Sequence, residues 1–497
     1  MVVGESGPPP SPLATKGTNE LRCIGATCLA RCSDCRVCNR RRIHCDRALP
    51  FCVKCARKGV QCPGYGPRFR WTNAIAIRGR FKGRGAPDIS DHNPSLNFEP
   101  RSLHRVNEES IPAPAYQAGL ALAQQLPPSA AKRLLQYYAT DIAPLMVWLD
   151  SEKNEYKCLV IPLAEKDTIL RLAVLTISAE HMPSADYLPP GFSQSTGEAA
   201  ILMITERVRQ MTESNTIDPQ IDVSGGITAG VLAAMLILSN HSLLKSELSH
   251  AQSHRQAARI LMNSLELKRP PNDDLTIFLR EQLAIYDVLA CTTLFNYEHI
   301  QGAILPHVSQ QDVPFGDFLN ILHHVTVMSL HDVKHAKPAE DLEDEFKLAC
   351  GSTLLAAGTL TQTLASSAKR DFIRLVQAYH HAGILYAYTR LYRPSGDERA
   401  VVVHTGELFK VLDQFEDIYA SLHNLAWPLF VAGTSCWGDE KRMGIISGLC
   451  QMLSTNTRFE HYTNLSIFLQ ELWQSSNSDW TLLARQWEQK GTPVIAV

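Results

Sequence analysis

Apolar residues recur every three or four positions along most of the chain, from about residue 128 onward. The stretch 274–294 shows this helical period clearly, and Asp273 or Asp274 is placed to cap its first turn. The stretch 372–386 repeats the pattern and stops before Pro394, a residue type that ends helices. No run of alternating Val, Ile and Thr indicates a sheet. The pattern predicts an all-α fold in which residues 128–490 form a large helical domain.

The chain before this domain lacks the helical period. Residues 70–125 are rich in Gly, Pro, Asn and Ser, which indicates a linker with short ordered pieces. The longest nearly apolar run, 226–238, has 13 residues and is too short to cross a bilayer. The first residues contain no apolar stretch typical of a secretory signal, so we expect an intracellular protein without a membrane partner. The expected parts are a disordered segment at 1–34, a small module at 35–62, a basic and then Pro/Gly-rich linker at 63–127, and the helical domain.

Charge is distributed unevenly along the sequence. The 497 residues carry a formal net charge of only −2. Residues 31–84, however, have a balance of +13, whereas residues 85–497 have a balance of −15. A compact basic segment ahead of a large acidic body indicates a polyanionic partner for the basic segment alone.

The basic segment also contains the six cysteines that stand in a regular spacing. Nine of the 14 cysteines lie in the first 62 residues, and six of these form two copies of C-x2-C-x6-C. The six are Cys35, Cys38, Cys45, Cys52, Cys55 and Cys62. In an intracellular chain this density favours metal binding over disulfides. Six thiolates can give two zinc ions four sulfur ligands each only if two sulfurs are shared. The spacing therefore predicts a cluster of two zinc ions that stabilises a module too small for an apolar core.

Basic side chains lie between and after these cysteines. Arg40, Arg41 and Arg42 follow one another within one helical turn between Cys38 and Cys45. Arginine can offer a bidentate fork to O6 and N7 of guanine, while neighbouring basic groups engage phosphates. Three arginines on one turn therefore favour guanine recognition in a major groove. The residues expected to contact DNA phosphates are Arg40, Lys54, Arg57 and Lys58.

The segment from Cys35 to Cys62 resembles the fungal binuclear zinc cluster of transcription regulators. The resemblance includes CDRALPFC at 45–52 and CPGYG at 62–66. It implies that Cys35 and Cys52 bridge the two metals and that Arg42, with Arg41, faces a CGG-type triplet. The chain departs from the family pattern at Asn39 and His44, where basic residues are usual, and it has extra cysteines before the cluster. One of them, Cys32, offers a second opening pair with Cys35, but only the Cys35/Cys38 frame has the family's spacing.

Parts of the helical region resemble the regulatory domain that follows the zinc cluster in one branch of these proteins. The similar stretches are 134–150, 278–293, 379–394 and 427–436. The resemblance implies transcription regulation, often with a small-molecule effector, and it supplies no catalytic residues. The aromatic stretch 379–392 is interpreted as core, with an effector pocket as the alternative. Histidine pairs at 323–324 and 380–381, and the spacing His331-x3-His335, occur without a catalytic motif, so we predict no enzyme activity.

These observations favour a nuclear, sequence-specific regulator that binds double-stranded DNA through a GC-rich triplet. Expected further partners are transcription co-regulators, a second copy of the chain and a small-molecule effector. One alternative is a corepressor or scaffold protein that retains the zinc cluster without docking on DNA. A second alternative, an enzyme in the helical domain, rests only on the scattered histidines.

Overall fold

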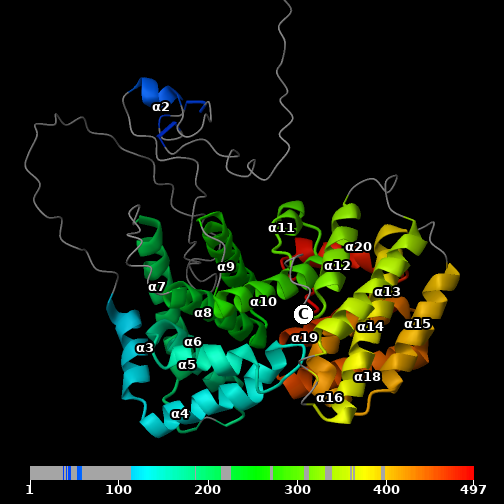
Figure 1. The fold of residues 1–497 in the computed structure, drawn as a ribbon, viewed down its shortest axis with the longest axis horizontal. Coiled ribbons are helices and arrows are strands. Elements are labelled where there is room, and N and C mark those ends of the chain that lie inside the picture. The colour runs from blue at the N-terminus through cyan, green and yellow to red at the C-terminus, as the bar shows by residue number, and fades with distance from the viewer. Residues whose placement is uncertain are drawn as a thin grey trace, which may run out of the picture. The chain divides into compact units, whose positions relative to one another are not determined.

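The computed structural model describes residues 37–38, 41, 43–45, 53–58, 113–184, 186–213, 225–268, 273–306, 313–330, 338–358, 361, 364–392 and 398–497. The chain divides into two compact units, residues 1–105 and residues 106–497. The described parts contain helices and turns and no strand, which confirms the all-α prediction (Figure 1). None of the described helices is both long and apolar enough to cross a membrane.

The second unit begins with helices that pack around one nearly apolar helix. The first group comprises α3 (Ala113–Gln125), α4 (Pro128–Tyr137), η2 (Tyr138–Ile142), η3 (Ala143–Met146), η4 (Tyr156–Val160), α5 (Ile161–Ala164), α6 (Thr168–His181), α7 (Phe192–Glu213), α8 (Gly225–Leu244) and α9 (Leu248–Lys268). Helix α8 is apolar on almost every side, and its residues from Ala229 to Leu238 are buried with hardly an interruption. It is therefore enclosed by α6, α9 and α10, as expected for a helix without a polar face.

The later helices pack around α14. They comprise α10 (Asp274–Cys291), α11 (Tyr297–Gln301), α12 (Gly316–Met328), α13 (Ala339–Ala356), α14 (Ser366–Leu391), α15 (Glu398–Asp413), α16 (Ile418–Ser421), η6 (Leu422–Leu425), α17 (Ala426–Ser435), α18 (Glu440–Thr457), α19 (His461–Gln474) and α20 (Trp480–Gln489). Helix α14 contacts α12, α13, α15 and α17. Its Tyr379 and Tyr386 are buried against Trp427 of α17, with ring centroids 5.5 and 5.8 Å from the indole.

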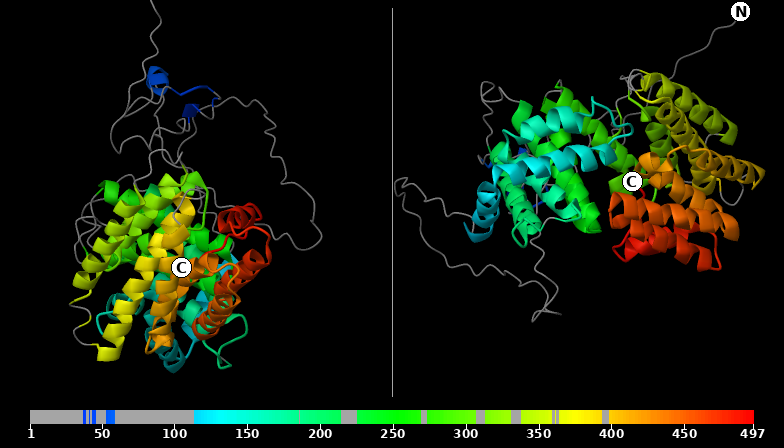
Figure 2. Two further views of the ribbon diagram at one scale, coloured as in Figure 1. Left: turned by 90° about the vertical axis from the view of Figure 1, so that its right-hand side faces the viewer. Right: turned by 90° about the horizontal axis from the view of Figure 1, so that it is seen from below.

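The two groups of helices meet at α10 and at the end of the described chain. In Figure 2 the earlier helices, cyan to green, and the later ones, yellow to red, lie on either side of residue 497. Residues 494–496 are buried between them. The Thr293 hydroxyl donates to the carbonyl of Val494 at 2.7 Å, and the Tyr462 hydroxyl donates to that of Val497 at 2.7 Å. The segment after α20 therefore contributes to the central core.

Both helices that the periodicity predicts are present. Helix α10 begins at Asp274, and the carboxylate of Asp273 accepts a hydrogen bond from the Thr276 amide at 2.8 Å, so Asp273 is the N-cap. Helix α14 ends at Leu391, before Pro394 as expected. The structure adds α3, which lies within the stretch 63–127 that the sequence predicts as a linker and packs against α7.

Candidate zinc centre and nucleic-acid interface

Three of the six predicted zinc ligands lie together in the first unit. Cys38, Cys45 and Cys55 are each 0% exposed and form one buried cluster, with Val37 and Ile43 packed against it. Nothing else apolar among the described residues of this unit joins the cluster. Three thiols are thus buried with few apolar side chains of the described residues around them. Such burial is expected of zinc ligands, because zinc replaces an apolar core in modules of this size.

Local hydrogen bonds place these cysteines. The Arg41 amide donates to the Val37 carbonyl at 3.0 Å, as in a helical turn, and the Ile43 amide donates to the Cys38 carbonyl at 3.1 Å. Helix α2 (Val53–Arg57) carries Cys55. The Lys54 ammonium donates to the carbonyl of His44 at 2.6 Å. This bond joins the two halves of the C-x2-C-x6-C repeat beside the buried sulfurs.

The basic residues that the structure describes lie on the surface of this unit. Arg41, Lys54, Arg57 and Lys58 are all exposed. Exposed basic groups beside a buried thiolate cluster offset its negative charge and favour an anionic partner. The remaining predicted residues, Cys35, Cys52, Cys62, Arg40 and Arg42, lie outside the described residues. No group of three or more His, Cys, Asp or Glu side chains among the described residues could by itself hold a metal ion.

The cysteine cluster and the helical unit together define a class of protein, one in which a small zinc-dependent module precedes a large all-α domain. Residues 33–72 match the fungal Zn(2)-Cys(6) binuclear cluster domain, and residues 133–488 match the fungal specific transcription factor domain. The second match covers well over half of the chain. The chain therefore belongs to the fungal transcription factors that carry a binuclear zinc cluster, a family of DNA-binding transcription regulators rather than enzymes. Its cluster domain binds two zinc ions.

Similar proteins agree with this assignment. The chain is 23% identical to the ustiloxin B cluster transcription factor of Aspergillus flavus over 568 positions, which cover 90% of this chain and 94% of that protein. It is 49% identical to the acriflavine sensitivity control protein of Neurospora crassa over 81 residues. That match covers 16% of this chain and 13% of the relative. A match with the transcriptional regulatory protein moc3 of Schizosaccharomyces pombe is 32% identical over 69 residues and covers 14% of this chain and 12% of moc3. No solved structure matches.

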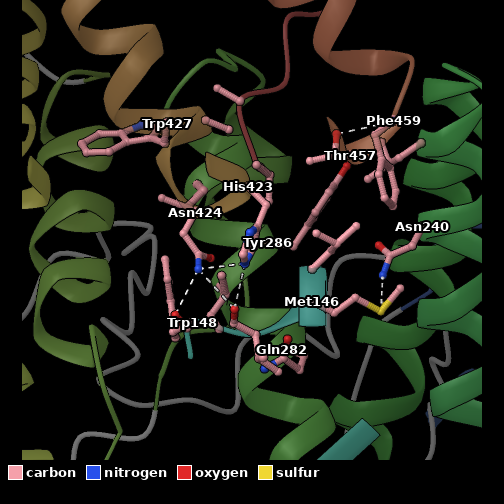
Figure 3. A pocket seen from close by; sticks show the side chains of 18 of the residues that line it. Met146, Trp148, Asn240, Gln282, Tyr286, His423, Asn424, Trp427, Thr457 and Phe459 are labelled. Carbon is pink, nitrogen blue, oxygen red and sulfur yellow. Dashed lines mark hydrogen bonds between the residues drawn. The ribbon is translucent and has the colours of Figure 1, made fainter. Parts of the chain in front are cut away.

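A cavity in the helical unit forms a second candidate site. It has a volume of about 110 Å³ and lies where the two groups of helices meet. Figure 3 shows Trp148 and Asn424 on one side of it, and Met146 and Asn240 on the other. Tyr379 of α14 lines it and is also buried in the core. Tyr379 is therefore part of the core and also part of the cavity wall.

The histidines named from the sequence do not assemble a reactive site among the described residues. His380 and His381 of α14 lie beside His404 of α15, and Nδ1 of His381 is 3.0 Å from Nδ1 of His404. Burial lowers the pKa of His381 to about 4, so this pair is uncharged near neutral pH. His331 and His335 lie outside the described residues. His404 could not be connected with this pair from the sequence, because only the packing of α15 on α14 brings it there.

Proposed function

We propose that the protein is a nuclear regulator that recognises a GC-rich, CGG-like triplet in double-stranded DNA through the helix after Cys38. Arg41 and Arg42 read the bases, and Arg40, Lys54, Arg57 and Lys58 contact the phosphates. The proposal rests on the exposed Arg41, whose backbone is hydrogen-bonded into the turn that carries buried Cys38. A turn fixed in this way presents Arg41 with little loss of backbone freedom on binding.

The chemistry of the side chains supports this division of roles. A guanidinium can donate two parallel hydrogen bonds to O6 and N7 of guanine, and each such pair discriminates against the wrong base by about 1–3 kcal/mol. A phosphate contact carries no sequence information but releases a counterion, so it makes binding depend on salt. Lys54, Arg57 and Lys58 are exposed on and directly after α2 and suit the second role.

We assign the acidic helical unit to regulation. Its expected partners are transcription co-regulators, a second copy of the chain and a small-molecule effector. This assignment follows from the family and from the cavity at the centre of the unit.

The test uses the full-length, zinc-loaded protein and duplexes that either contain a CGG triplet or have random sequence. We expect Arg42→Ala to cost about 1–3 kcal/mol on the CGG duplex and to relax the base preference. Arg57→Ala should weaken binding to both duplexes about equally and reduce the slope of affinity against salt by about one unit. Lys132→Ala is the control, because this exposed lysine lies in the helical unit and has no proposed DNA contact.

Two outcomes would overturn the proposal. If Arg42→Ala and Arg57→Ala weaken both duplexes equally, base reading by Arg42 is wrong. If the zinc-loaded wild type binds both duplexes weakly and alike, the protein is better described as a corepressor or scaffold that retains its zinc cluster.

A further inference from the structure

The cavity of the helical unit contains a buried positive charge that is not paired with an Asp or Glu side chain among the described residues of its wall. Arg255 of α9 lines it, and the whole residue is only 5% exposed. No Asp or Glu is among the described residues that line the cavity. The nearby carboxylate of Asp287 pairs instead with Arg259, whose Nε lies 2.6 Å from it. A buried ion is costly unless it is paired, so this guanidinium needs an anion.

The guanidinium is held in place with part of its donor edge unused. Its Nε donates to the Ser239 hydroxyl at 2.9 Å, and one N–H of Nη2 donates to the Asn240 side-chain oxygen at 2.8 Å. Its central carbon lies 3.4 Å from the centre of the Tyr286 ring. Among the described residues Nη1 has no hydrogen-bond acceptor, and Nη2 has one further N–H. These two groups match the two oxygens of a carboxylate.

Two further buried donors in the cavity wall lack partners. The Tyr286 hydroxyl and the Trp148 indole N–H have no hydrogen-bond acceptor among the described residues, and Tyr286 is 4% exposed. The indole is fixed, because it stacks on Phe315 at 4.2 Å and its own carbonyl accepts a hydrogen bond from the Asn424 amide at 3.0 Å (Figure 3). Buried polar groups are normally paired, so each unpaired donor points to an acceptor that the chain itself does not supply.

Among the described residues of the wall, Arg255 is the side chain that carries a charge near pH 7. Burial lowers the pKa of His423 and of His461 to about 4, so both imidazoles are neutral near pH 7. The rest of the wall is largely apolar and includes Met146, Leu289 and Phe459. At about 110 Å³ the cavity is somewhat smaller than the roughly 150 Å³ apolar cavity that accommodates benzene.

We propose that this cavity binds a small organic monocarboxylate with a compact apolar body of about three or four carbon atoms, smaller than a benzene ring. The carboxylate lies against Nη1 and Nη2 of Arg255, and the Trp148 and Tyr286 donors supply its remaining hydrogen bonds. The apolar body fills the space beside Met146, Leu289 and Phe459. This inference assigns a chemical class to the effector of the proposed function. The presence of the ligand site itself does not depend on DNA binding.

The experiment measures binding to the full-length protein by calorimetry and by the rise in melting temperature. The probes are butanoate, 2-methylpropanoate and 3-methylbutanoate, and 3-methylbutanamide serves as a neutral analogue of nearly the same shape as 3-methylbutanoate. We expect at least one acid to bind with a dissociation constant below about 1 mM and 3-methylbutanamide to bind at least tenfold more weakly than 3-methylbutanoate. Arg255→Gln should abolish acid binding. Arg390→Gln is the matched control, because Arg390 is also largely buried but does not line the cavity.

Two conservative variants keep the test decisive even if Arg255→Gln does not fold. Tyr286→Phe and Trp148→Phe each remove one unpaired donor and preserve the aromatic packing, so each should weaken acid binding several-fold. The proposal is overturned if none of the acids binds by 10 mM, if 3-methylbutanamide binds as tightly as 3-methylbutanoate, or if the two conservative variants bind acids as the wild type does. None of these readouts involves DNA, so failure of this inference is distinct from failure of DNA recognition.

Discussion

The buried ion pair between α9 and α10 gives the sharpest prediction about stability. The Arg259 side chain is 4% exposed and that of Asp287 is 0% exposed. Nη2 of Arg259 donates to one carboxylate oxygen of Asp287 at 2.9 Å, and the other oxygen lies 2.6 Å from Nε of Arg259 and accepts from the Ile304 amide at 3.0 Å. The pair therefore joins α9, α10 and the segment after α11. Removing either partner leaves the other as a buried, uncompensated charge.

The structure sets the size of the effect. Two unit charges about 4 Å apart attract each other by about 4 kcal/mol at an effective dielectric constant of 20, and breaking a buried pair costs about 3–5 kcal/mol. Asp287→Leu and Arg259→Met should each cost about this much. The double variant loses both charges and leaves mainly the Ile304 amide unpaired, which costs about 1–3 kcal/mol. The double variant should therefore be more stable than either single variant.

Urea unfolding followed by circular dichroism measures these free energies as a double-mutant cycle. Arg370→Met is the control, because Arg370 and Glu416 form an ion pair with 52% and 38% of their side chains exposed. Its loss should cost less than about 1 kcal/mol. If the costs of the two single variants simply add in the double variant, the argument that an unpaired buried charge causes the loss is wrong.

Two further predictions concern packing and acid. Gly383→Ala should destabilise the protein by about 1–3 kcal/mol, because a Cβ there would lie 2.5 Å from the Phe346 ring. Gly351→Ala should raise stability by about 0.5–1 kcal/mol, because a Cβ there would have no atom within 4 Å. Thermal unfolding of both variants tests these values. Burial lowers the folded-state pKa of His423 and of His461 from the ordinary 6.5 to about 4. Above pH 6.5 both imidazoles are neutral in the folded and the unfolded chain, so stability does not depend on their titration. As the pH falls from 6.5 toward 4, the free energy of unfolding should decrease by up to about 2.7 kcal/mol per pH unit for the two residues together. Melting temperatures that stay level across this range in the wild type would contradict the neutral, buried state of both imidazoles.

The sequence predicts those features that depend on local spacing. The helical period and a capping aspartate are enough to place α10, and doubled cysteine spacing is enough to predict the cluster in which Cys38, Cys45 and Cys55 are buried. Helix α3 is missed because it follows a Gly/Pro-rich stretch and lacks charged residues at either end.

The cavity could not be predicted because its wall is made by residues far apart in the chain. Trp148 lies between η3 and η4, Arg255 lies on α9, and Asn424 lies on η6. No local pattern connects them, and Arg255 reads as an ordinary polar position on an amphipathic helix. Only the packing of the two groups of helices shows that its guanidinium is enclosed in a cavity whose described wall residues include no Asp or Glu.

Selection of duplexes from a random DNA library by the full-length protein tests the central claim most directly, together with a zinc count on the same sample. We predict two zinc ions per chain and enrichment of a GC-rich triplet, with both lost after zinc is removed by a chelator. Two zinc ions without any enriched sequence would contradict base reading by Arg41 and Arg42. Fewer than two zinc ions would contradict the ligand set that includes Cys35 and Cys38.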